Sequence, residues 1–180
     1  WWPASSEFEV CVGAILTQNT AWSNAEKAVA NIKKAKMLSC KKIAGLRLEK
    51  IARLIKPSGY YNQKAKSLKL FCQSLQKNYN SSLKKLFSQP VPELRKELLS
   101  MHGIGNETAD SIILYAAGKP LFVIDSYTKR LNERLPLSQK AGTYLQLQSF
   151  FQNRLPKSAR LYNEFHALIV MHCKEVCRKK

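Results

Sequence analysis

Two glycines separated by one residue mark the segment whose residue types most clearly indicate a binding site. Gly103 and Gly105 flank Ile104 in the run His102-Gly-Ile-Gly-Asn106, which joins two amphipathic stretches. Glycine tolerates positive φ and leaves the backbone uncovered, and we expect the apolar Ile104 to turn inward between the helices. The backbone N–H groups of the turn and of the next helix would then point outward and bind an anion such as a phosphate. A tight turn that needs glycine only for steric reasons is the alternative interpretation.

The charge balance indicates a polyanionic partner. The 180 residues contain 30 Lys and Arg against 12 Asp and Glu, which gives a net charge of +18 and a pI near 9.9. Such a field concentrates polyanions and speeds their capture, so we expect the partner to be a nucleic acid. With 45% hydrophobic residues the chain can still bury a core, which excludes a disordered polycation. A ribosomal or chromatin-type structural binder is the alternative.

Cysteine usage and hydropathy bear on compartment and cofactor. The cysteine count is odd, with 5 Cys in the chain, which favours a reducing compartment over a disulfide framework. Cys173 and Cys177 lie one helical turn apart, but a metal or cluster site needs about four ligands, so we expect both to be structural. No stretch approaches the roughly 20 apolar residues of a membrane span, and no signal peptide is visible. The chain opens at Trp1 without Met, so we expect an N-terminal piece to be missing.

Apolar residues recur at helical spacing along nearly the whole chain, and no stretch shows sustained alternation with period two. We therefore expect an all-α fold. Breaks are expected at Pro57-Ser-Gly59 and at Gly118-Lys-Pro120, and Leu121–Ile124 is a short apolar run between helices. The predicted helices cover residues 8–15, 23–32, 42–55, 62–77, 82–87, 92–100, 107–117, 125–135, 143–153 and 158–177.

Several segments resemble the helix–hairpin–helix DNA glycosylases of the endonuclease III superfamily. They are MHGIGNETADSIILY at 101–115 followed by FVIDSYTKR at 122–130, AILTQNT at 14–20, and GYYNQKA at 59–65. The resemblance covers nearly the whole chain and implies two helical lobes with the active site in the cleft between them. One lobe would be residues 17–121, with the helix–hairpin–helix at about 92–118, and the other residues 1–16 plus 122–180.

Two departures from the family pattern indicate the subtype. Bifunctional members carry a lysine nucleophile two residues after the second hairpin glycine, whereas this chain has Glu107, which cannot form a Schiff base. Iron–sulfur members carry four cysteines after the last helix, and Cys177 resembles only the first, so no cluster is expected in this chain. Glu107, the start Trp1-Trp2-Pro3 and Trp22 resemble the 3-methyladenine DNA glycosylase branch, the bacterial type III enzyme.

This resemblance implies a monofunctional hydrolase of base excision repair that removes alkylated purines such as 3-methyladenine, without AP-lyase activity. Asp125 stands where the family places its catalytic aspartate. An ionised carboxylate beside the sugar C1′ stabilises an oxocarbenium-like transition state and can orient or deprotonate a water. The position before Ser-Tyr-Thr at a helix start is also typical of a plain N-cap, and the two roles can coexist.

Recognition of the base is expected to depend on aromatic side chains. A base alkylated at a ring nitrogen is cationic, leaves as a neutral molecule and stacks well on electron-rich rings. We expect Trp1, Trp2 and Trp22 to supply those rings around a flipped base, with Pro3 shaping the wall and Glu107 at the mouth of the pocket. Core packing is the alternative for each tryptophan.

The family match also suggests DNA contacts. Gln18 and Tyr60 lie where side chains wedge into the base stack, although a solvated helix end is the alternative for Gln18. Lys129 and Arg130 are expected to face the DNA backbone. The hairpin would contribute His102, Gly103, Ile104 and Gly105.

Other basic residues are expected to make only diffuse contacts. The lysine-rich faces around Lys33, Lys34, Lys64 and Lys66 are expected to be diffuse phosphate contacts, and a merely solvated side chain is the alternative for any one of them. Neither His102 nor His166 nor His172 has a partner pattern, so all three are expected to be structural or phosphate-adjacent rather than catalytic.

Two other functions remain open. One is a glycosylase for a mispaired normal base or uracil, and the other is a non-catalytic helix–hairpin–helix DNA-binding module. In each case the expected partner is double-stranded DNA, here carrying an alkylated base, with no membrane and no metal. We expect a monomer in the bacterial cytoplasm, associated with the nucleoid.

Overall fold

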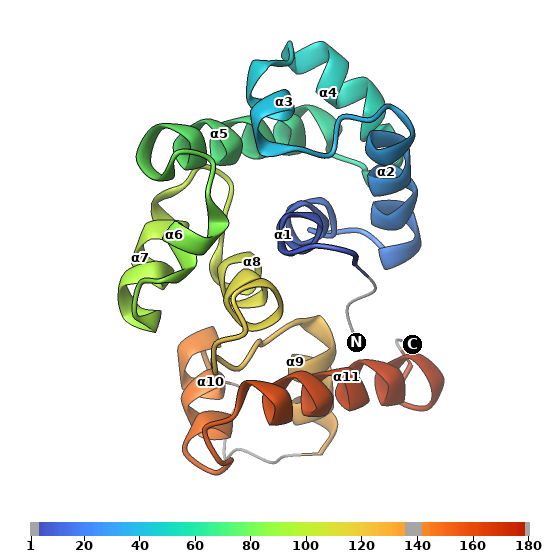
Figure 1. Ribbon diagram of the computed structural model, residues 1–180. Coiled ribbons are helices and arrows are strands. Elements are labelled where there is room, and N and C mark those ends of the chain that lie inside the picture. The colour runs from blue at the N-terminus through green and yellow to red at the C-terminus, as the bar shows by residue number, and fades with distance from the viewer. Residues whose placement is uncertain (1–3, 136–141, 179–180) are drawn as a thin grey trace.

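The computed structural model describes residues 4–135 and 142–178 as helices joined by short loops (Figure 1). No strand occurs in these two ranges, which confirms the predicted all-α fold. None of their helices combines the length and the apolar character that crossing a bilayer requires. The elements, including the 3-10 turn η1 and the π-helical turn η2, are α1 (Glu7–Leu16), α2 (Trp22–Lys34), α3 (Cys40–Gly45), α4 (Leu48–Leu54), η1 (Lys56–Ser58), α5 (Tyr61–Tyr79), α6 (Leu83–Phe87), α7 (Val91–Ser100), α8 (Asn106–Ser111), η2 (Ile112–Ala116), α9 (Ser126–Arg134), α10 (Tyr144–Gln152) and α11 (Ala159–Glu175).

Two hydrophobic clusters divide the chain near residue 121. The larger cluster gathers the buried side chains of α1 to η2 and ends at Leu121. The smaller one begins with the extended segment Phe122–Ile124 and continues into α10 and α11. Figure 1 shows α9, α10 and α11 together on one side of the molecule, with the arc of α2 to α8 on the other. Leu114 of η2 belongs to the smaller cluster and therefore connects the two.

Helix α1 departs from the expected lobe boundary. We expected residues 1–16 to pack with residues 122–180, but Val10, Ile15 and Leu16 belong to the larger cluster. Helix α1 contacts α2, α5, α8 and η2 and lies inside the arc (Figure 1). Its residues from Glu9 to Leu16 are all buried, and a helix that is apolar nearly all round has to be surrounded.

The single helix expected over residues 42–55 is instead two. Helix α3 ends at Gly45, the backbone is extended at Leu46 and Arg47, and α4 follows. Both short helices pack along α5, and the break lets each of them bury its apolar side chains there. Lys69 of α5 donates to the Leu46 carbonyl at 2.7 Å, which satisfies a backbone acceptor exposed by the break. Tertiary packing therefore overrides the local helical periodicity.

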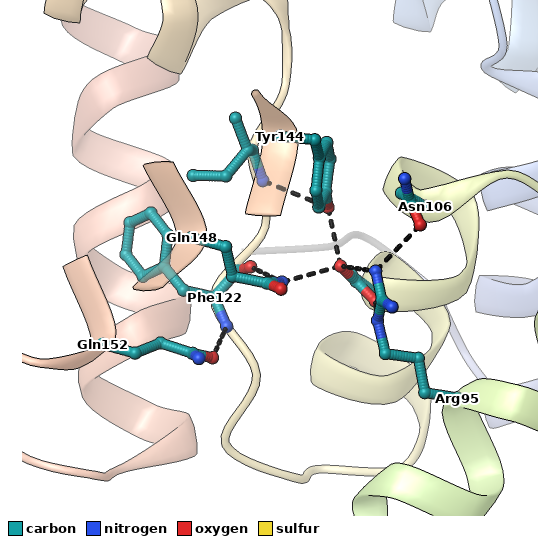
Figure 2. A network of polar contacts seen from close by, with 8 residues as sticks. Arg95, Asn106, Phe122, Tyr144, Gln148 and Gln152 are labelled. Atoms are coloured by element: carbon teal, nitrogen blue, oxygen red, sulfur yellow. Dashed lines mark hydrogen bonds and ion pairs between the residues drawn. The ribbon is translucent and has the colours of Figure 1, made fainter. Parts of the chain in front are cut away.

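The segment Phe122–Ile124 is held in place by polar side chains of α10 (Figure 2). The Phe122 N–H donates to Gln152 Oε1 at 3.0 Å, and Gln148 Nε2 donates to the Phe122 carbonyl at 2.7 Å. The Ile124 N–H donates to the Tyr144 hydroxyl at 3.4 Å. Side chains of α10 thus bind three backbone groups of this buried extended segment.

A buried carboxylate, Asp110 of α8, connects the hairpin to α10, and its partners Arg95, Tyr144 and Gln148 are labelled in Figure 2. Its side chain has no exposed surface. Arg95 Nε donates to Oδ1 at 2.7 Å, while the Tyr144 hydroxyl and Gln148 Nε2 donate to Oδ2 at 2.8 and 2.7 Å. Arg95 also donates to the Asn106 side chain at 2.9 Å. The helices of the hairpin and the segment that follows them therefore share one polar network.

Replacing Asp110 by Ala removes the acceptor of this network. The Arg95 guanidinium then loses its carboxylate at a largely buried position, and the free energy of unfolding should fall by about 3–5 kcal/mol. The control is Glu164→Ala, which breaks the exposed pair with Arg160 on α11 and should leave stability unchanged. Chemical denaturation of both variants measures the difference, and equal stabilities would show that the two clusters meet without help from Asp110.

Candidate active site

Asp125 lies at the point where the extended segment turns into α9. It is the N-cap of that helix, with its Oδ1 accepting from the Thr128 N–H at 2.7 Å and from the Thr128 hydroxyl at 2.9 Å. The residue is 9% exposed, so the carboxylate is nearly enclosed. The predicted N-cap is confirmed. Because both Thr128 bonds fall on Oδ1, the other oxygen keeps acceptor capacity for another group.

The surroundings of Asp125 favour its ionised form. Burial would raise the pKa of this carboxyl, but the nearby His166 imidazole and the two bonds from Thr128 outweigh burial. The net result is a pKa below the ordinary aspartate value. A buried carboxylate that stays charged at neutral pH can stabilise a developing positive charge or orient a water.

His166 is the partner that the sequence did not reveal. We expected it to be structural or phosphate-adjacent, but its Nε2 lies 3.5 Å from Asp125 Oδ2 and its Nδ1 lies 2.5 Å from the Tyr115 hydroxyl. The imidazole is 5% exposed and meets the edge of the Phe122 ring. His166 on α11 and Tyr115 on η2 therefore surround Asp125 from two different elements.

Glu107 occupies the first turn of α8 and interacts electrostatically with Asp125, Lys129 and His166. Its side chain keeps an exposed surface, as expected for a residue at the mouth of a cleft. Desolvation by the surrounding protein and, next, the charge of Asp125 raise its pKa to about 7. Around neutral pH the protonated and ionised forms of the Glu107 side chain are therefore present in comparable amounts.

The hairpin turn distinguishes its two glycines. Gly103 has φ +76°, and a Cβ there would collide with Ser67 of α5. Gly105 has φ −94°, which any residue adopts, and a Cβ there would meet nothing within 4 Å. The positive φ that glycine permits is therefore used at Gly103 and not at Gly105. Ile104 is 5% exposed and packs into the larger cluster, as predicted.

The backbone of Gly105 lies beside open space. Neither backbone strain nor crowding inside the chain demands glycine there, and its backbone is left open to close approach from outside. His102 beside the turn is exposed. The steric alternative raised from the sequence therefore explains Gly103 alone.

The two predicted wedge residues differ in how they are held. Gln18 is tied to the hairpin, because its Nε2 donates to the Gly103 carbonyl at 2.9 Å and to the Thr108 hydroxyl at 2.8 Å. Tyr60 is 66% exposed and has a left-handed backbone with φ +45°. Such a conformation costs energy in a bulky residue and persists where surrounding structure enforces it. The wedge role stays a prediction for both residues.

The two predicted contacts to the DNA backbone, Lys129 and Arg130, differ in their surroundings. Arg130 does not face outward: its guanidinium donates to the Cys177 carbonyl at 2.8 Å and the Cys173 carbonyl at 2.9 Å, and so caps the end of α11. A cation is favoured at a helix C-terminus, which explains the position. Lys129, its neighbour, is exposed beside Glu107.

Lys64 was expected to be a diffuse phosphate contact and is instead buried. Its Nζ donates to the Leu16 carbonyl at 2.9 Å and to the Ser58 carbonyl at 2.6 Å. Burial lowers its pKa to about 8. Lys33 pairs with Glu9 at 2.5 Å, so it too has a partner within the chain. The lysine Lys66 remains on an exposed face.

The predicted aromatic pocket is only partly described. Trp1, Trp2 and Pro3 lie outside the described residues, and Trp22 packs half-buried against the larger cluster. A hollow of about 310 Å³ lies between α1, η2 and α11. A larger hollow of about 530 Å³ lies on α4 and shares no residue with this site. The smaller hollow is lined by Ala4, Ser5, Ser6, Glu7, Val10, Tyr115 and Asn163.

The cysteines of α11 and its end do not form a metal centre with other side chains in the described ranges. These ranges contain no group of three or more His, Cys, Asp or Glu side chains arranged for a metal ion. The sulfur of Cys177 accepts instead from Arg134 at 3.2 Å. A four-cysteine cluster needs ligands that these residues do not supply, and the expectation of no cofactor stays a prediction.

Three residues of the site and its supporting network were not predicted from the sequence, and the reason is the same for each. His166, Tyr115 and Asp110 are single polar residues within apolar helical patterns, and each acquires its role from a partner on another element. The only sequence signal for them is their position on faces that are otherwise apolar. A buried polar residue must have a partner, but the sequence does not say which.

Known proteins resemble this chain in sequence and in structure. Residues 12–157 match the family described as HhH-GPD superfamily base excision DNA repair protein. A relative from Methanocaldococcus jannaschii, named as a candidate DNA repair glycosylase, is 46% identical over 181 residues, covering all of this chain and 82% of the relative. The thymine/uracil-DNA glycosylase of Pyrobaculum aerophilum is 26% identical over 187 residues, which are 100% of this chain and 76% of that protein.

A solved structure shares the fold closely. The crystal structure of H. pylori 3-methyladenine DNA glycosylase bound to 1,N6-ethenoadenine aligns with a TM-score of 0.84 at 33% identity, covering 96% of this chain and 86% of that one. The family match over most of the chain confirms the resemblance drawn from the hairpin and Asp125. The chain belongs to the HhH-GPD superfamily of base excision DNA repair proteins, the helix–hairpin–helix DNA glycosylases.

Proposed function

We propose that this glycosylase is monofunctional and excises alkylated, cationic purines such as 3-methyladenine from double-stranded DNA. The observation that carries the proposal is an ionised, buried Asp125 beside the acidic residue Glu107 instead of an amine. The similarity to the H. pylori 3-methyladenine enzyme supports it. We further propose that the protein works as a monomer on nucleoid DNA in the cytoplasm.

Excision of a cationic base requires a charged carboxylate rather than a strong acid. Cleavage of the N-glycosidic bond leaves positive charge on the sugar, and the Asp125 carboxylate would stabilise that charge and orient the attacking water. A cationic base departs with the bonding electron pair and becomes neutral, so it needs no proton from the protein. Oδ2 of Asp125, the oxygen that Thr128 does not bind, is the one proposed to face the sugar.

The absence of lyase activity follows from the same position. A lyase amine would form a Schiff base with the sugar C1′, whereas the Glu107 carboxylate cannot. Negative charge from Glu107 would instead add to the field that attracts a cationic base. The product would then be an intact strand with an abasic site.

DNA binding is proposed to depend on the hairpin and on the net charge of +18. The open backbone at Gly105 and the start of α8 would receive a phosphate. Tyr60, exposed beside η1, would fill the space left by a base flipped out of the duplex.

A second candidate function is excision of a mispaired thymine or uracil, which the similarity to the P. aerophilum enzyme favours. Those bases are neutral in the duplex and leave more easily when a group donates a proton. Glu107 with a pKa of about 7 is partly protonated at neutral pH and could donate one. The two functions therefore demand opposite charge states of the same residue.

The deciding assay compares base release from methylated DNA and from duplexes with G·T and G·U mismatches. We expect release of 3-methyladenine, no release from the mismatches, and no covalent adduct when borohydride is added to abasic DNA. Asp125→Asn should cost about 3–4 kcal/mol of barrier, or a few hundredfold in single-turnover rate, with DNA affinity preserved. Release of thymine or uracil alone would support the second function, and a normal rate for Asp125→Asn would leave the residue only its N-cap role.

The pKa of Glu107 predicts the pH dependence. If its negative charge assists a cationic base such as 7-methylguanine, excision should rise several-fold as pH increases through about 7, and Glu107→Gln should abolish that rise. A rate that falls over the same range would identify Glu107 as a proton donor and oppose the alkylbase proposal. Because folding raises this pKa from an ordinary value of 4.5, the wild type loses stability between about pH 4.5 and 7. Glu107→Gln should therefore be more stable than wild type at pH 8, with little difference at pH 4, in thermal unfolding.

The two hairpin glycines should respond differently to the same substitution. Gly105→Ala adds a methyl group in open space, so stability should stay constant while affinity for damaged and undamaged DNA falls together. Gly103→Ala forces a left-handed alanine against Ser67 and should lower the free energy of unfolding by about 1–2 kcal/mol or more. Thermal unfolding and DNA titrations measure both effects. A loss for Gly105→Ala confined to damaged DNA would assign this glycine to the base pocket.

A further inference from the structure

A chain of three polar groups crosses the boundary between the two hydrophobic clusters. Tyr115 of η2 contacts His166 Nδ1 through its hydroxyl, and His166 Nε2 faces Asp125 Oδ2 at 3.5 Å. The imidazole is 5% exposed, and Nε2 has no hydrogen-bond partner within ordinary distance among the described residues. A buried ring nitrogen is therefore aimed at the one carboxylate oxygen that Thr128 leaves unbound.

The contact with Tyr115 bears on which imidazole nitrogen carries the hydrogen. Burial, and then the charge of Asp125, hold the pKa of this phenol well above its ordinary value, so the hydroxyl keeps its hydrogen at any physiological pH. A protonated phenol can donate to an unprotonated ring nitrogen, and we assign Nδ1 as the acceptor in this contact. The neutral ring then carries its hydrogen on Nε2, the nitrogen that faces Asp125.

We infer that His166 is a positioning residue for Asp125: oriented by Tyr115, it donates its Nε2–H to Oδ2 and keeps the carboxylate ionised and aimed at the reacting sugar. The inference rests on the proposed function of Asp125. The Thr128 bonds stop rotation of one oxygen, and His166 fixes the plane of the other. At 3.5 Å the contact is long, as catalytic hydrogen bonds often are before substrate binds and excludes water.

A purely structural role for His166 fits these contacts less well. A histidine kept only for packing would have both ring nitrogens satisfied by groups of its own cluster. Here Nδ1 is bonded to Tyr115 and Nε2 points to the catalytic candidate. The position also differs from that of His172 on the same helix, which is exposed.

Charges near His166 bear on its effect at different pH. The ionisable groups that face it are Asp125 and Tyr115, and Glu107 lies close enough to interact with it. Lys129, which interacts with Glu107, is the nearby cation of α9. Losing the His166 donor leaves Asp125 near another carboxylate, with the Thr128 bonds as its remaining hydrogen-bond donors. Its protonation should then occur at higher pH.

The test compares His166→Phe, His166→Gln and the control His172→Gln in single-turnover excision from pH 4 to 8. His166→Phe should slow excision by about ten- to a hundredfold, the range for losing one hydrogen bond to a charged group, without weakening DNA binding. As pH is lowered, the excision rate of His166→Phe should begin to fall at a higher pH than the rate of wild type. His166→Gln supplies an amide N–H near the position of Nε2 and should recover most of the rate, while His172→Gln should match wild type.

Carboxyl and imidazole NMR tests the inference without activity. Asp125 should titrate at higher pH in His166→Phe than in wild type, and the His166 ring should lose its Nε2–H form in Tyr115→Phe. An unchanged Asp125 titration in His166→Phe, or an excision profile that follows the His172→Gln control, overturns the inference. If the wild type releases none of the tested bases but the variants show these changes in Asp125 titration and His166 tautomer, the proposed function is contradicted and the inference is supported.

Discussion

The carboxylate of Asp125 receives two hydrogen bonds from Thr128 on one oxygen and faces His166 with the other. These contacts offset the burial that would otherwise neutralise it. They require α9 to begin at residue 126, and this start in turn requires the segment Phe122–Ile124 to end there. The polar side chains of α10 fix that segment through its backbone groups. Much of the smaller cluster can thus be understood as support for one charged group.

The second constraint is the buried network around Asp110. A polar network in a protein interior is costly unless every member is satisfied, and Asp110 accepts from Arg95, Tyr144 and Gln148. Tyr144 and Gln148 also bond the segment that leads into Asp125. The hairpin and the aspartate are therefore linked by shared side chains. Contacts that position a DNA backbone on the hairpin would at the same time set the distance from the sugar to Asp125.

The fold of the glycosylase superfamily does not by itself select the lesion. The family and its fold account for the hairpin, the capping aspartate and the helical arc. In the proposed function, lesion choice would depend on the charge state of Glu107 and on the aromatic residues predicted to contact the flipped base. Glu107 lies close enough to Asp125 for each carboxylate to disfavour the charge of the other, which is why Glu107 takes the raised pKa. This division leaves Asp125 charged and Glu107 adjustable.

The amino-acid sequence by itself determined the all-α fold, the hairpin, the burial of Ile104 and the N-cap at Asp125. Each of these depends on neighbours within a turn or two, through helical periodicity, a glycine or a capping side chain. Only the tertiary structure decided that His166 faces Asp125, that Arg130 caps α11 and that Lys64 is buried beneath α1. It also placed α1 in the larger cluster and divided the helix expected over residues 42–55. The physical reason is the same in each case: a polar or apolar group gains its free energy from a partner far along the chain, and local sequence pattern carries no record of that partner.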